Sequence, residues 1–347
     1  MNIDFSQHLN LKSLFPQTEF GEKVISFLNE WYSESKTVSV QTSGSTGTPK
    51  IFEVEKERML HSAKMTCDIL HLKKGDSALL CLPIEYISGK MMVVRAIERN
   101  LDLEVKIPSS QPLLDLKAET DFCAMSPLQV ENSLDQIHLI KNIIIGGAAV
   151  SETLKSKIKD SLRRKATQNS IYETYGMSET LSHIALKQIY PVAEDYFKVL
   201  KNVEISLDER KCLQIFAPQL NPEILKTNDL VELKNEKEFR FLGRIDNVIN
   251  SAGLKIYPEE LENLLKTVIP NEVVFLGIKD ELLGDKLVVA IEGKNESGIK
   301  DQLATINFPT KNHRPKEYVF LEKFPRIANG KVDRKEINKM ITALMKK

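Results

Sequence analysis

The stretch TSGSTGTPK, residues 42–50, follows the strand-like VSV at residues 38–40 after one intervening residue, Gln41. Its two glycines, Gly44 and Gly47, let backbone N–H groups approach a ligand that a Cβ atom would exclude. Its serine and threonine hydroxyls and the Lys50 ammonium are donors that suit the oxygens of a polyphosphate. The stretch therefore predicts a phosphate-binding loop, although its composition fits a flexible Ser/Gly/Thr surface loop equally well.

Two common nucleotide-binding patterns do not fit this loop. A Walker-type loop requires G-x-x-x-x-G-K-[ST], whereas Gly47 is followed by Thr48 and Pro49. The Rossmann spacing G-x-G-x-x-G is also absent. A phosphate-binding loop at this place must therefore be of another kind.

Strand-like and helix-like stretches alternate around this loop, from residue 38 to about residue 176. Short apolar runs at 77–83 and 142–147 end at Pro or Gly, as buried strands do. Apolar residues at helical spacing predict helices over 56–70 and 151–164, with Ser151 as the N-cap of the second. This alternation predicts α/β layers around a sheet with many parallel strands.

The pattern changes near residue 200, where a hairpin and then a compact tail are expected. The predicted elements are strands over 203–207 and 212–216, a helix over 258–265, strands over 272–278 and 286–293, and a last helix from about residue 333. We expect an α/β fold with a large N-terminal domain, residues 1–245, that includes a strand-rich portion. A small, mobile α+β C-terminal domain would follow at residues 246–347.

Composition narrows the class of protein. Lys plus Arg equals Asp plus Glu, 48 of each, so a basic nucleic-acid-binding surface is not expected. The four cysteines form no C-x-x-C pair, which argues against a zinc ribbon and for reduced thiols. The N-terminus does not resemble a signal peptide, and no apolar segment approaches the roughly 20 residues of a membrane helix. We therefore expect a soluble, cytoplasmic protein that does not insert into a membrane.

Six motifs in order resemble those of the adenylate-forming enzymes, a family of acyl- and aryl-CoA ligases, luciferases and peptide-synthetase adenylation domains. The resemblance runs from about residue 40 to the end of the chain. The motifs are TSGSTGTPK (42–50), IIGGAA (144–149), YETYGMSET (172–180), TND (227–229), GRIDNVINSAGLKIYPEELE (243–262) and PRIANGKVDRK (325–335).

The resemblance implies an AMP-forming acid–thiol ligase that uses ATP, Mg²⁺ and coenzyme A. It makes Lys331 the catalytic lysine, Glu179 the Mg²⁺ ligand and Ser178 a contact of the α-phosphate. The implied phosphate-binding residues are Thr42, Ser43, Gly44, Ser45, Thr46, Gly47 and Lys50. The implied adenine- and ribose-binding residues are Gly146, Gly147, Ala148, Tyr175, Gly176, Asp229 and Arg244. Tyr175 would stack on adenine, and Asp229 would accept hydrogen bonds from the ribose.

The same resemblance implies that the two domains rotate about their boundary. Asp246 would be a hinge that brings Lys331 to the adenylating site and then swings it away, after which Gly253 and Lys255 would border the route of the CoA thiol. Lysine is suited to the first step because a carboxylate attacking the α-phosphorus brings two anions together.

Gly176 would allow a sharp turn after its strand. Asn228 replaces the glycine usual in the family, and asparagine tolerates left-handed backbone angles.

The sequence determines the acid substrate less well than it determines the reaction mechanism. The implied acyl pocket contains Tyr86, Ser88, Gly89, Lys90, Arg95, Ser126 and His183, with His183 a wall residue rather than a base. Lys90 and Arg95 lie in an apolar segment, where a cation is costly unless it reaches water or meets an anion. The simpler explanation is that both extend outward to water, and the other is a substrate with a second carboxylate.

The region before the phosphate loop is shorter than in most of the family, as in the short o-succinylbenzoate–CoA ligases of menaquinone synthesis, which the segment YISGKMM also resembles. The resemblance therefore implies o-succinylbenzoate, a dicarboxylate, as the acid substrate. Two alternatives stay open: a ligase for another fatty, aryl or amino acid, with a carrier-protein thiol as acceptor, and a non-catalytic nucleotide-binding sensor. A homodimer would cover any sheet edge that the shortened region leaves open.

Overall fold

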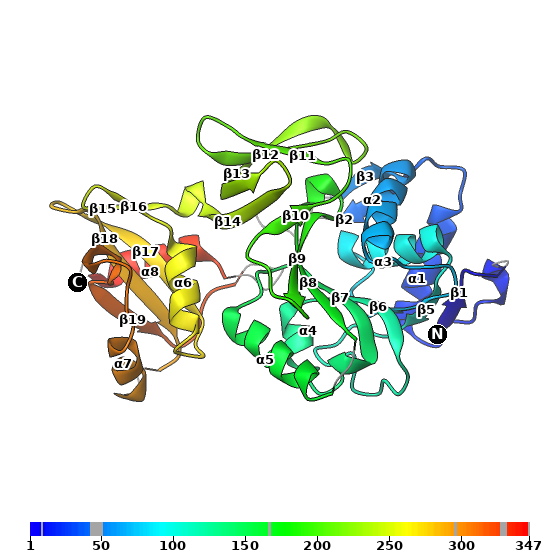
Figure 1. Cartoon of the computed structure of the whole chain (residues 1–347), viewed down its shortest axis with the longest axis horizontal. Coiled ribbons are helices and arrows are strands. Elements are labelled where there is room, and N and C mark those ends of the chain that lie inside the picture. The colour runs from blue at the N-terminus through cyan, green and yellow to red at the C-terminus, as the bar shows by residue number, and fades with distance from the viewer. Residues whose placement is uncertain (8–9, 42–50, 166–167, 295–296, 327–331, 346–347) are drawn as a thin grey trace.

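The computed structural model describes residues 1–7, 10–41, 51–165, 168–294, 297–326 and 332–345 (Figure 1). The predicted phosphate loop, 42–50, and the predicted catalytic residue Lys331 both lie outside the described residues.

A large sheet runs through most of the molecule. Among the described residues its order is β1-β5-β4-β6-β7-β8-β9-β10-β14-β13-β12-β11. Its strands are β1 (Asn2–Asp4), β4 (Ser77–Leu80), β5 (Asp102–Val105), β6 (Thr120–Met125), β7 (Ile140–Ile145), β8 (Ser170–Gly176), β9 (His183–Tyr190), β10 (Phe197–Val199), β11 (Glu204–Leu207), β12 (Cys212–Ala217), β13 (Asn221–Asn235) and β14 (Glu238–Arg244).

The central strands β5, β4, β6, β7 and β8 are parallel, and the strands from β9 to β11 continue the sheet antiparallel. Successive residues of the parallel strands enter two different cores. Leu80 and Ile144 belong to one core, whereas Leu79 and Ile145 belong to the other. Both faces of this part of the sheet are buried, which explains why its strands are apolar runs rather than alternating ones.

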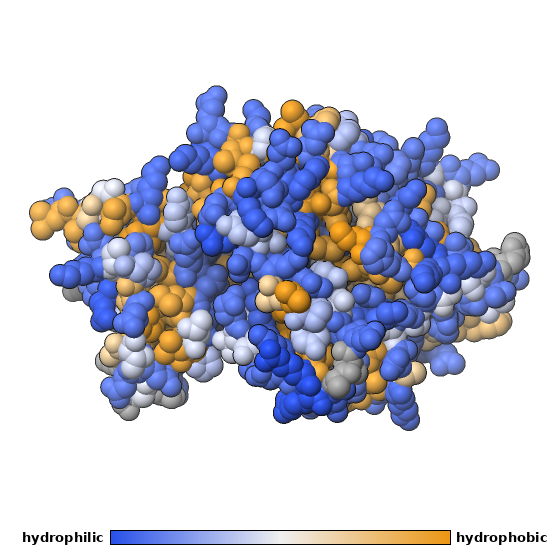
Figure 2. Space-filling view, in the orientation of Figure 1, coloured by the Kyte–Doolittle hydropathy of each residue, from blue (hydrophilic) through white to orange (hydrophobic). Residues whose placement is uncertain are grey.

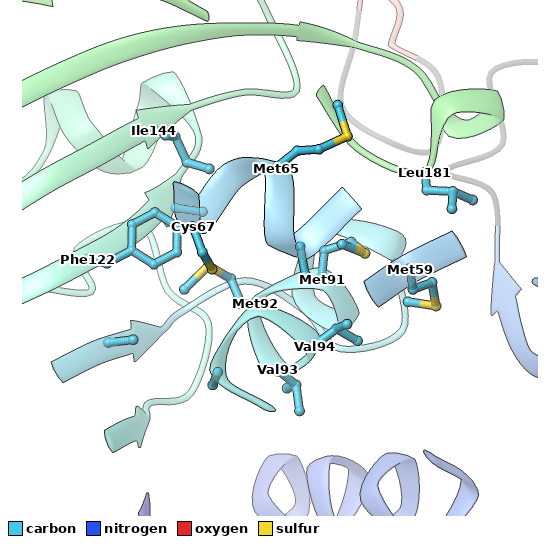
Figure 3. Packing of buried hydrophobic residues seen from close by; sticks show 14 of the residues in the cluster. Met59, Met65, Cys67, Met91, Met92, Val93, Val94, Phe122, Ile144 and Leu181 are labelled. Carbon is cyan, nitrogen blue, oxygen red and sulfur yellow. The ribbon is translucent and has the colours of Figure 1, made fainter. Parts of the chain in front are cut away.

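The helices are distributed between these two faces. Residues of α1, α2 and α3 join the first core, and residues of α5 join the second. Figure 3 shows the first core close up, with Met92 of α3 near Phe122 of the sheet and Met59 of α2 on the opposite side of the view, toward Leu181. The helices are α1 (Glu19–Trp31), α2 (Lys56–Ile69), α3 (Ile87–Arg99), α4 (Pro127–Glu131), α5 (Glu152–Arg163), α6 (Pro258–Lys266), α7 (Ser297–Ala304) and α8 (Arg334–Met345).

A second, smaller sheet follows after the large one and has cores of its own (Figure 1). It runs β16-β15-β18-β17, and β19 pairs with β18 in parallel. Thr153 Oγ1 of α5 donates to the carbonyl of Lys266 in α6 at 2.7 Å, which joins the two parts of the chain. The strands are β15 (Ile249–Ser251), β16 (Leu254–Ile256), β17 (Val273–Asp280), β18 (Gly284–Glu292) and β19 (Glu317–Leu321).

A two-stranded hairpin lies outside both sheets. β2 (Thr37–Gln41) and β3 (Ile51–Glu55) pair antiparallel, with Gln41 opposite Ile51. The predicted phosphate loop therefore joins the two strands of this hairpin. Gln41 also forms an isolated parallel bridge with Tyr86, just before α3.

The structure confirms the α/β prediction and the helices and strands expected from the sequence, within a few residues at each end. Ser151 caps α5 as predicted, because its side chain accepts a hydrogen bond from the Leu154 N–H at 3.1 Å. Hydrophilic side chains cover most of the face shown in Figure 2. None of the helices in the described ranges is long and apolar enough to cross a membrane.

Candidate active site

A cavity of about 1130 Å³ opens at the carboxyl ends of the parallel strands. Leu82 follows β4, Ser126 follows β6, and Gly146 follows β7, and all three line it. This edge is where open α/β sheets bind their ligands. Of the predicted site residues, the structure places these in the cavity lining: Gly146, Gly147, Ala148, Tyr175, Gly176, Ser178, Asp229, Tyr86, Ser88, Arg95, Ser126 and His183.

Tyr175 and Asp229 form a polar pair in this lining. Tyr175 Oη donates to Asp229 Oδ2 at 2.5 Å, and Arg244 Nη1 lies 3.4 Å from Asp229 Oδ1. Burial and the adjacent Asp229 carboxylate raise the pKa of Tyr175, so the phenol keeps its proton and donates. A carboxylate offers about four lone-pair sites. Asp229 can therefore still accept hydrogen bonds from the hydroxyls of a ligand.

Aromatic side chains fix the Tyr175 ring. Its centroid lies 5.0 Å from that of Phe239 in an edge-on arrangement, 5.8 Å from Phe197 and 6.4 Å from Phe241. Such pairs add stability beyond the area they bury. The hydroxyl is thus held toward Asp229, and the role of the ring in stacking on adenine stays a prediction.

Gly176 is required for a reason other than the predicted turn. A Cβ at this position would lie 2.3 Å from the carbonyl oxygen of Ser182 and 2.4 Å from the Cα of His183. Gly176 is the last residue of β8 and is not among the described glycines with positive φ. Close approach of two backbone segments, rather than turn geometry, therefore excludes a side chain here.

Ser178 and Glu179 lie near the end of β8, as predicted, in a short 3₁₀ helix, Ser178–Thr180, that Met177 separates from the strand. Ser178 lines the cavity. The Glu179 side chain is exposed beside it, and its backbone carbonyl accepts a hydrogen bond from Asn221 Nδ2 at 3.2 Å. The described residues include no cluster of three or more His, Cys, Asp or Glu that could hold a metal.

Arg95 of α3 lines the cavity while its side chain is only 2% exposed. Its Nη2 donates to Ser182 Oγ at 2.6 Å. Ser182 Oγ lies 3.3 Å from His183 Nδ1, and His183 Nε2 lies 3.1 Å from Thr66 Oγ1. Burial and the nearby Arg95 keep the pKa of His183 well below its usual value, so this imidazole is neutral. His183 lines the cavity, and its role as a wall residue rather than a base stays a prediction.

The expectation that Lys90 and Arg95 extend to water is wrong. Lys90 is 9% exposed and places its ammonium 4.4 Å from the centroid of the Phe27 ring in α1. Lys90 does not line the cavity, and neither does Gly89, where a Cβ would meet the backbone of Pro83 at 2.2 Å. A cation–π contact thus accounts for Lys90, whereas it does not account for Arg95.

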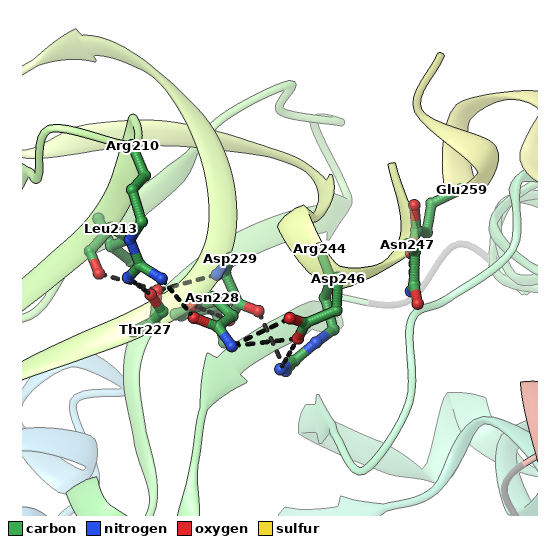
Figure 4. A network of polar contacts seen from close by, with 10 residues as sticks. Arg210, Leu213, Thr227, Asn228, Asp229, Arg244, Asp246, Asn247 and Glu259 are labelled. Carbon is green, nitrogen blue, oxygen red and sulfur yellow. Dashed lines mark hydrogen bonds and ion pairs between the residues drawn. The ribbon is translucent and has the colours of Figure 1, made fainter. Parts of the chain in front are cut away.

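Asp246 lies in the 3₁₀ helix Ile245–Asn247 and is tied to the large sheet (Figure 4). Asn228 Nδ2 donates to Asp246 Oδ2 at 3.1 Å, and Arg244 Nη2 donates to the same oxygen at 3.0 Å. Asn228 is not among the described residues with positive φ, so the suggestion that it fills a left-handed position is wrong. Its side chain instead links Asp246 to Arg210, whose Nη1 donates to Asn228 Oδ1 at 2.9 Å.

No family model matches the chain. A solved structure of an acyl-CoA synthetase (AMP-forming)/AMP-acid ligase II-like protein from Dyadobacter fermentans is 32% identical to it. The match covers 95% of this chain and 97% of that one, with a TM-score of 0.64.

This chain belongs to the AMP-forming acyl-CoA synthetases, which are adenylate-forming enzymes.

More distant members of the synthetase family agree with this assignment. The 2-succinylbenzoate–CoA ligase of Lactococcus lactis is 24% identical, over 96% of this chain and 81% of that protein. The corresponding ligase of Listeria monocytogenes is 27% identical, over 89% and 71%. The solved O-succinylbenzoate coenzyme A synthetase of Bacillus subtilis shares the fold, with a TM-score of 0.72 at 21% identity over 86% of this chain and 69% of that one.

Some site residues expected of a synthetase are not in the cavity lining. The residues Thr42, Ser43, Gly44, Ser45, Thr46, Gly47, Lys50 and Lys331 lie outside the described part of the chain. Gly253 and Lys255 lie exposed at the β15–β16 hairpin of the smaller sheet. Their roles stay predictions.

Sequence reasoning missed Thr66, which does not line the cavity but contacts His183 of its lining. Thr66 looks ordinary in the sequence, where it lies in a helical pattern. Thr66 is fully buried, and Ser182 bonds both Arg95 and His183. Only the packing of α2 and α3 against the start of β9 brings them together.

Proposed function

We propose that this protein joins a carboxylic acid to coenzyme A at the expense of ATP, and that the acid is 2-succinylbenzoate. A carboxylate oxygen attacks the α-phosphorus of ATP and expels pyrophosphate, which leaves an acyl-adenylate. The CoA thiolate then attacks the acyl carbon and expels AMP. The observation that carries the proposal is the Tyr175–Asp229 pair, which shares one cavity with Ser178 in a chain of this enzyme family.

The nucleotide is assigned to the sheet side of the cavity. Asp229 has acceptor capacity left for two ribose hydroxyls, and the hydrogen bond from Tyr175 fixes which way its oxygens point. Gly147, at φ +86 with open space beside it, leaves the backbone after β7 accessible to a ligand. Ser178 is placed to contact the α-phosphate.

Mg²⁺ fits the donors present. Mg²⁺ usually keeps several waters and takes one or two carboxylates together with phosphate oxygens, rather than an all-protein cage. The exposed Glu179 carboxylate beside Ser178 supplies one such ligand, and the absence of a larger acidic cluster among the described residues agrees with that mode. The ion would neutralise phosphate charge as pyrophosphate leaves.

The chain would work as two domains, residues 1–245 and 246–347, that rotate about Asp246. The separate cores of the smaller sheet support this division. Rotation would have to break or shift the Asp246 contacts with Asn228 and Arg244, which lie on the other side of the boundary. Lys331, in the C-terminal domain, would stabilise the charge that develops during adenylation.

A panel of acids tests the proposal directly. Pyrophosphate release would be measured with 2-succinylbenzoate and with fatty, aryl and amino acids, and the thioester would be identified by mass spectrometry. We expect 2-succinylbenzoate to give the highest kcat/KM and a CoA thioester. A higher kcat/KM with another acid would show that 2-succinylbenzoate is not the substrate. If no acid caused pyrophosphate release, a nucleotide-binding sensor would be favoured instead.

Replacing Asp229 by asparagine should raise the KM for ATP about tenfold and leave the KM for the acid unchanged. The amide keeps the shape but loses the charge, and a hydrogen bond to a charged group contributes roughly 1.5 kcal/mol or more. Steady-state kinetics with each substrate varied in turn would measure both constants. Glu223→Gln, on the exposed part of the same strand β13, is the matched control. An equal rise in both constants would contradict the ribose assignment.

A further inference from the structure

A second cavity, of about 600 Å³, lies between helix α2 and the turns that follow β10 and β12. None of the described residues lines both this second cavity and the active-site cavity. Its volume is within the roughly 300–1,000 Å³ of pockets that bind small molecules. The second cavity is therefore a separate place at which a small molecule can bind.

One face of α2 forms the first wall of the second cavity. Its lining residues are spaced by three and four positions, as one helical face requires: His61, Lys64, Met65 and Asp68. The charge of Asp68 is offset by Arg99, whose Nη2 lies 2.5 Å from Asp68 Oδ1. Lys64 is exposed and forms no ion pair within the described part of the chain. This wall thus presents a cation whose charge is not offset.

The opposite wall consists of two turns. Lys201 and Asn202 come from the turn after β10, and Gln219 comes from the turn after β12. Asn202 Nδ2 donates to Gln219 Oε1 at 3.4 Å, which joins the two turns and leaves the N–H groups of Gln219 for a ligand. Lys201 is exposed and, among the residues that the structure describes, has no carboxylate partner. A second cation therefore faces the first across the cavity.

These walls suit an organic anion. Two cations on opposite walls attract a negative group, and the side-chain amides and imidazoles of the lining add neutral donors. Met65 and Leu200, which are 9% and 1% exposed, give the lining an apolar part. A ligand that fills this space thus has an acidic group and an apolar body.

Both walls of the second cavity are joined to the start of β9. Thr66 of α2 places its Oγ1 3.1 Å from His183 Nε2. From the other wall, the Leu200 N–H donates to the carbonyl of Ile184, the residue after His183, at 2.8 Å. Because His183 lines the active-site cavity, a ligand that holds the two walls together acts on both sides of a residue of that lining.

We propose that the second cavity binds a small organic anion with an apolar body, and that the bound anion holds α2 and the turn after β10 together around the start of β9. Such a ligand regulates the active-site cavity from outside it. Binding at the second cavity does not depend on the proposed function, whereas regulation of the acid–CoA ligation rests on it.

Binding is tested with 8-anilinonaphthalene-1-sulfonate, an aromatic sulfonate whose fluorescence rises in apolar surroundings. It would be titrated into the full chain with AMP and 2-succinylbenzoate in excess, so that these occupy the active-site cavity. Lys64→Met and Lys201→Met should each raise its Kd about fivefold, and the double variant about 25-fold, because each change removes one charge that attracts the sulfonate. Both lysines are exposed, so neither change should prevent folding.

Lys73→Met is the matched control. Lys73 is exposed just beyond the end of α2 and does not line the second cavity, so its loss should leave the Kd at the wild-type value. No binding by the wild-type protein, or a Kd of the double variant within about twofold of the wild-type Kd, would overturn the proposal.

Hydrogen exchange tests the effect of binding on β9. With the sulfonate at ten times its Kd, backbone amides at the start of β9 should exchange up to about tenfold more slowly in the wild-type protein, because opening of this segment must release the ligand. The double variant at the same sulfonate concentration should show little slowing. Equal exchange rates with and without the sulfonate in the wild-type protein would contradict the link between the second cavity and His183.

Kinetics separate this proposal from the proposed function. In an active enzyme the sulfonate should change the KM for 2-succinylbenzoate about threefold or more in the wild-type protein and not in the double variant. A KM that changes equally in both would mean competition inside the active-site cavity and would overturn the regulatory role. An enzyme that turns over no acid, but gives the expected Kd values and exchange rates, would refute the proposed function and leave the second site supported.

Discussion

Replacing Lys331 by alanine is expected to slow acyl-adenylate formation by about 10³-fold. The lysine would supply positive charge where two anions meet, and removing one such electrostatic stabiliser typically costs about 3–4 kcal/mol of the barrier. Pyrophosphate release in a single turnover, with enzyme in excess of the acid, measures this step without interference from product release. KM for ATP should change much less than kcat, because the interaction forms mainly in the transition state.

The second half-reaction provides the control for this variant. A synthetic acyl-adenylate mixed with CoA should give thioester at a rate within about threefold of the wild-type rate, since Lys331 would be turned away during this step. Lys335→Ala, an exposed lysine four residues further along in α8, should leave both steps unchanged. Equal loss of both half-reactions in Lys331→Ala would contradict the assigned role.

The second large effect is expected from Gly176→Ala, which should lower the free energy of unfolding by about 3 kcal/mol or more. The new methyl group would overlap the backbone of Ser182 and His183, and backbone cannot move aside as the end of a flexible side chain can. The sole tryptophan, Trp31, is packed in the first core, so its fluorescence reports unfolding of this part of the molecule during denaturation.

Gly298→Ala is the matched control for this change. No atom lies within 4 Å of the Cβ that would be added there, and the residue is exposed in α7. Alanine is favoured over glycine in a helix by about 1 kcal/mol. The control should therefore leave the protein as stable as before or slightly more stable. If the free energy of unfolding of Gly176→Ala equalled that of the wild-type protein, the backbone around Gly176 and the backbone of Ser182 and His183 would be able to separate.

Much of the fold could be predicted because local signals and tertiary structure agree. The apolar run at 142–147 became the buried strand β7, and the amphipathic pattern at 151–164 became α5 with the predicted Ser151 cap. Both signals depend on residues that are close together in the sequence. The motif after β8 likewise placed Ser178 at the sheet edge, because a parallel strand fixes where its carboxyl end lies.

The direction of the long side chains could not be predicted in the same way. Lys90 and Arg95 are five residues apart on one helix, yet one meets an aromatic ring of α1 and the other a serine that precedes β9. Which partner each finds depends on elements that are distant in the sequence. The contribution of Asn228 could not be predicted for the same reason. Its side chain contacts Arg210 and Asp246, and the backbone preference of asparagine does not reveal such contacts.

Tyr175 and Asp229 stand on strands of one continuous sheet, whereas Arg95 and Thr66 stand on the helices α3 and α2. Under the predicted roles, handling of the cosubstrate and choice of the acid would be carried by separate layers of the molecule. A lineage, or a protein engineer, would then exchange residues of the helical layer to accept new acids while the strand layer continued to activate them in the same way.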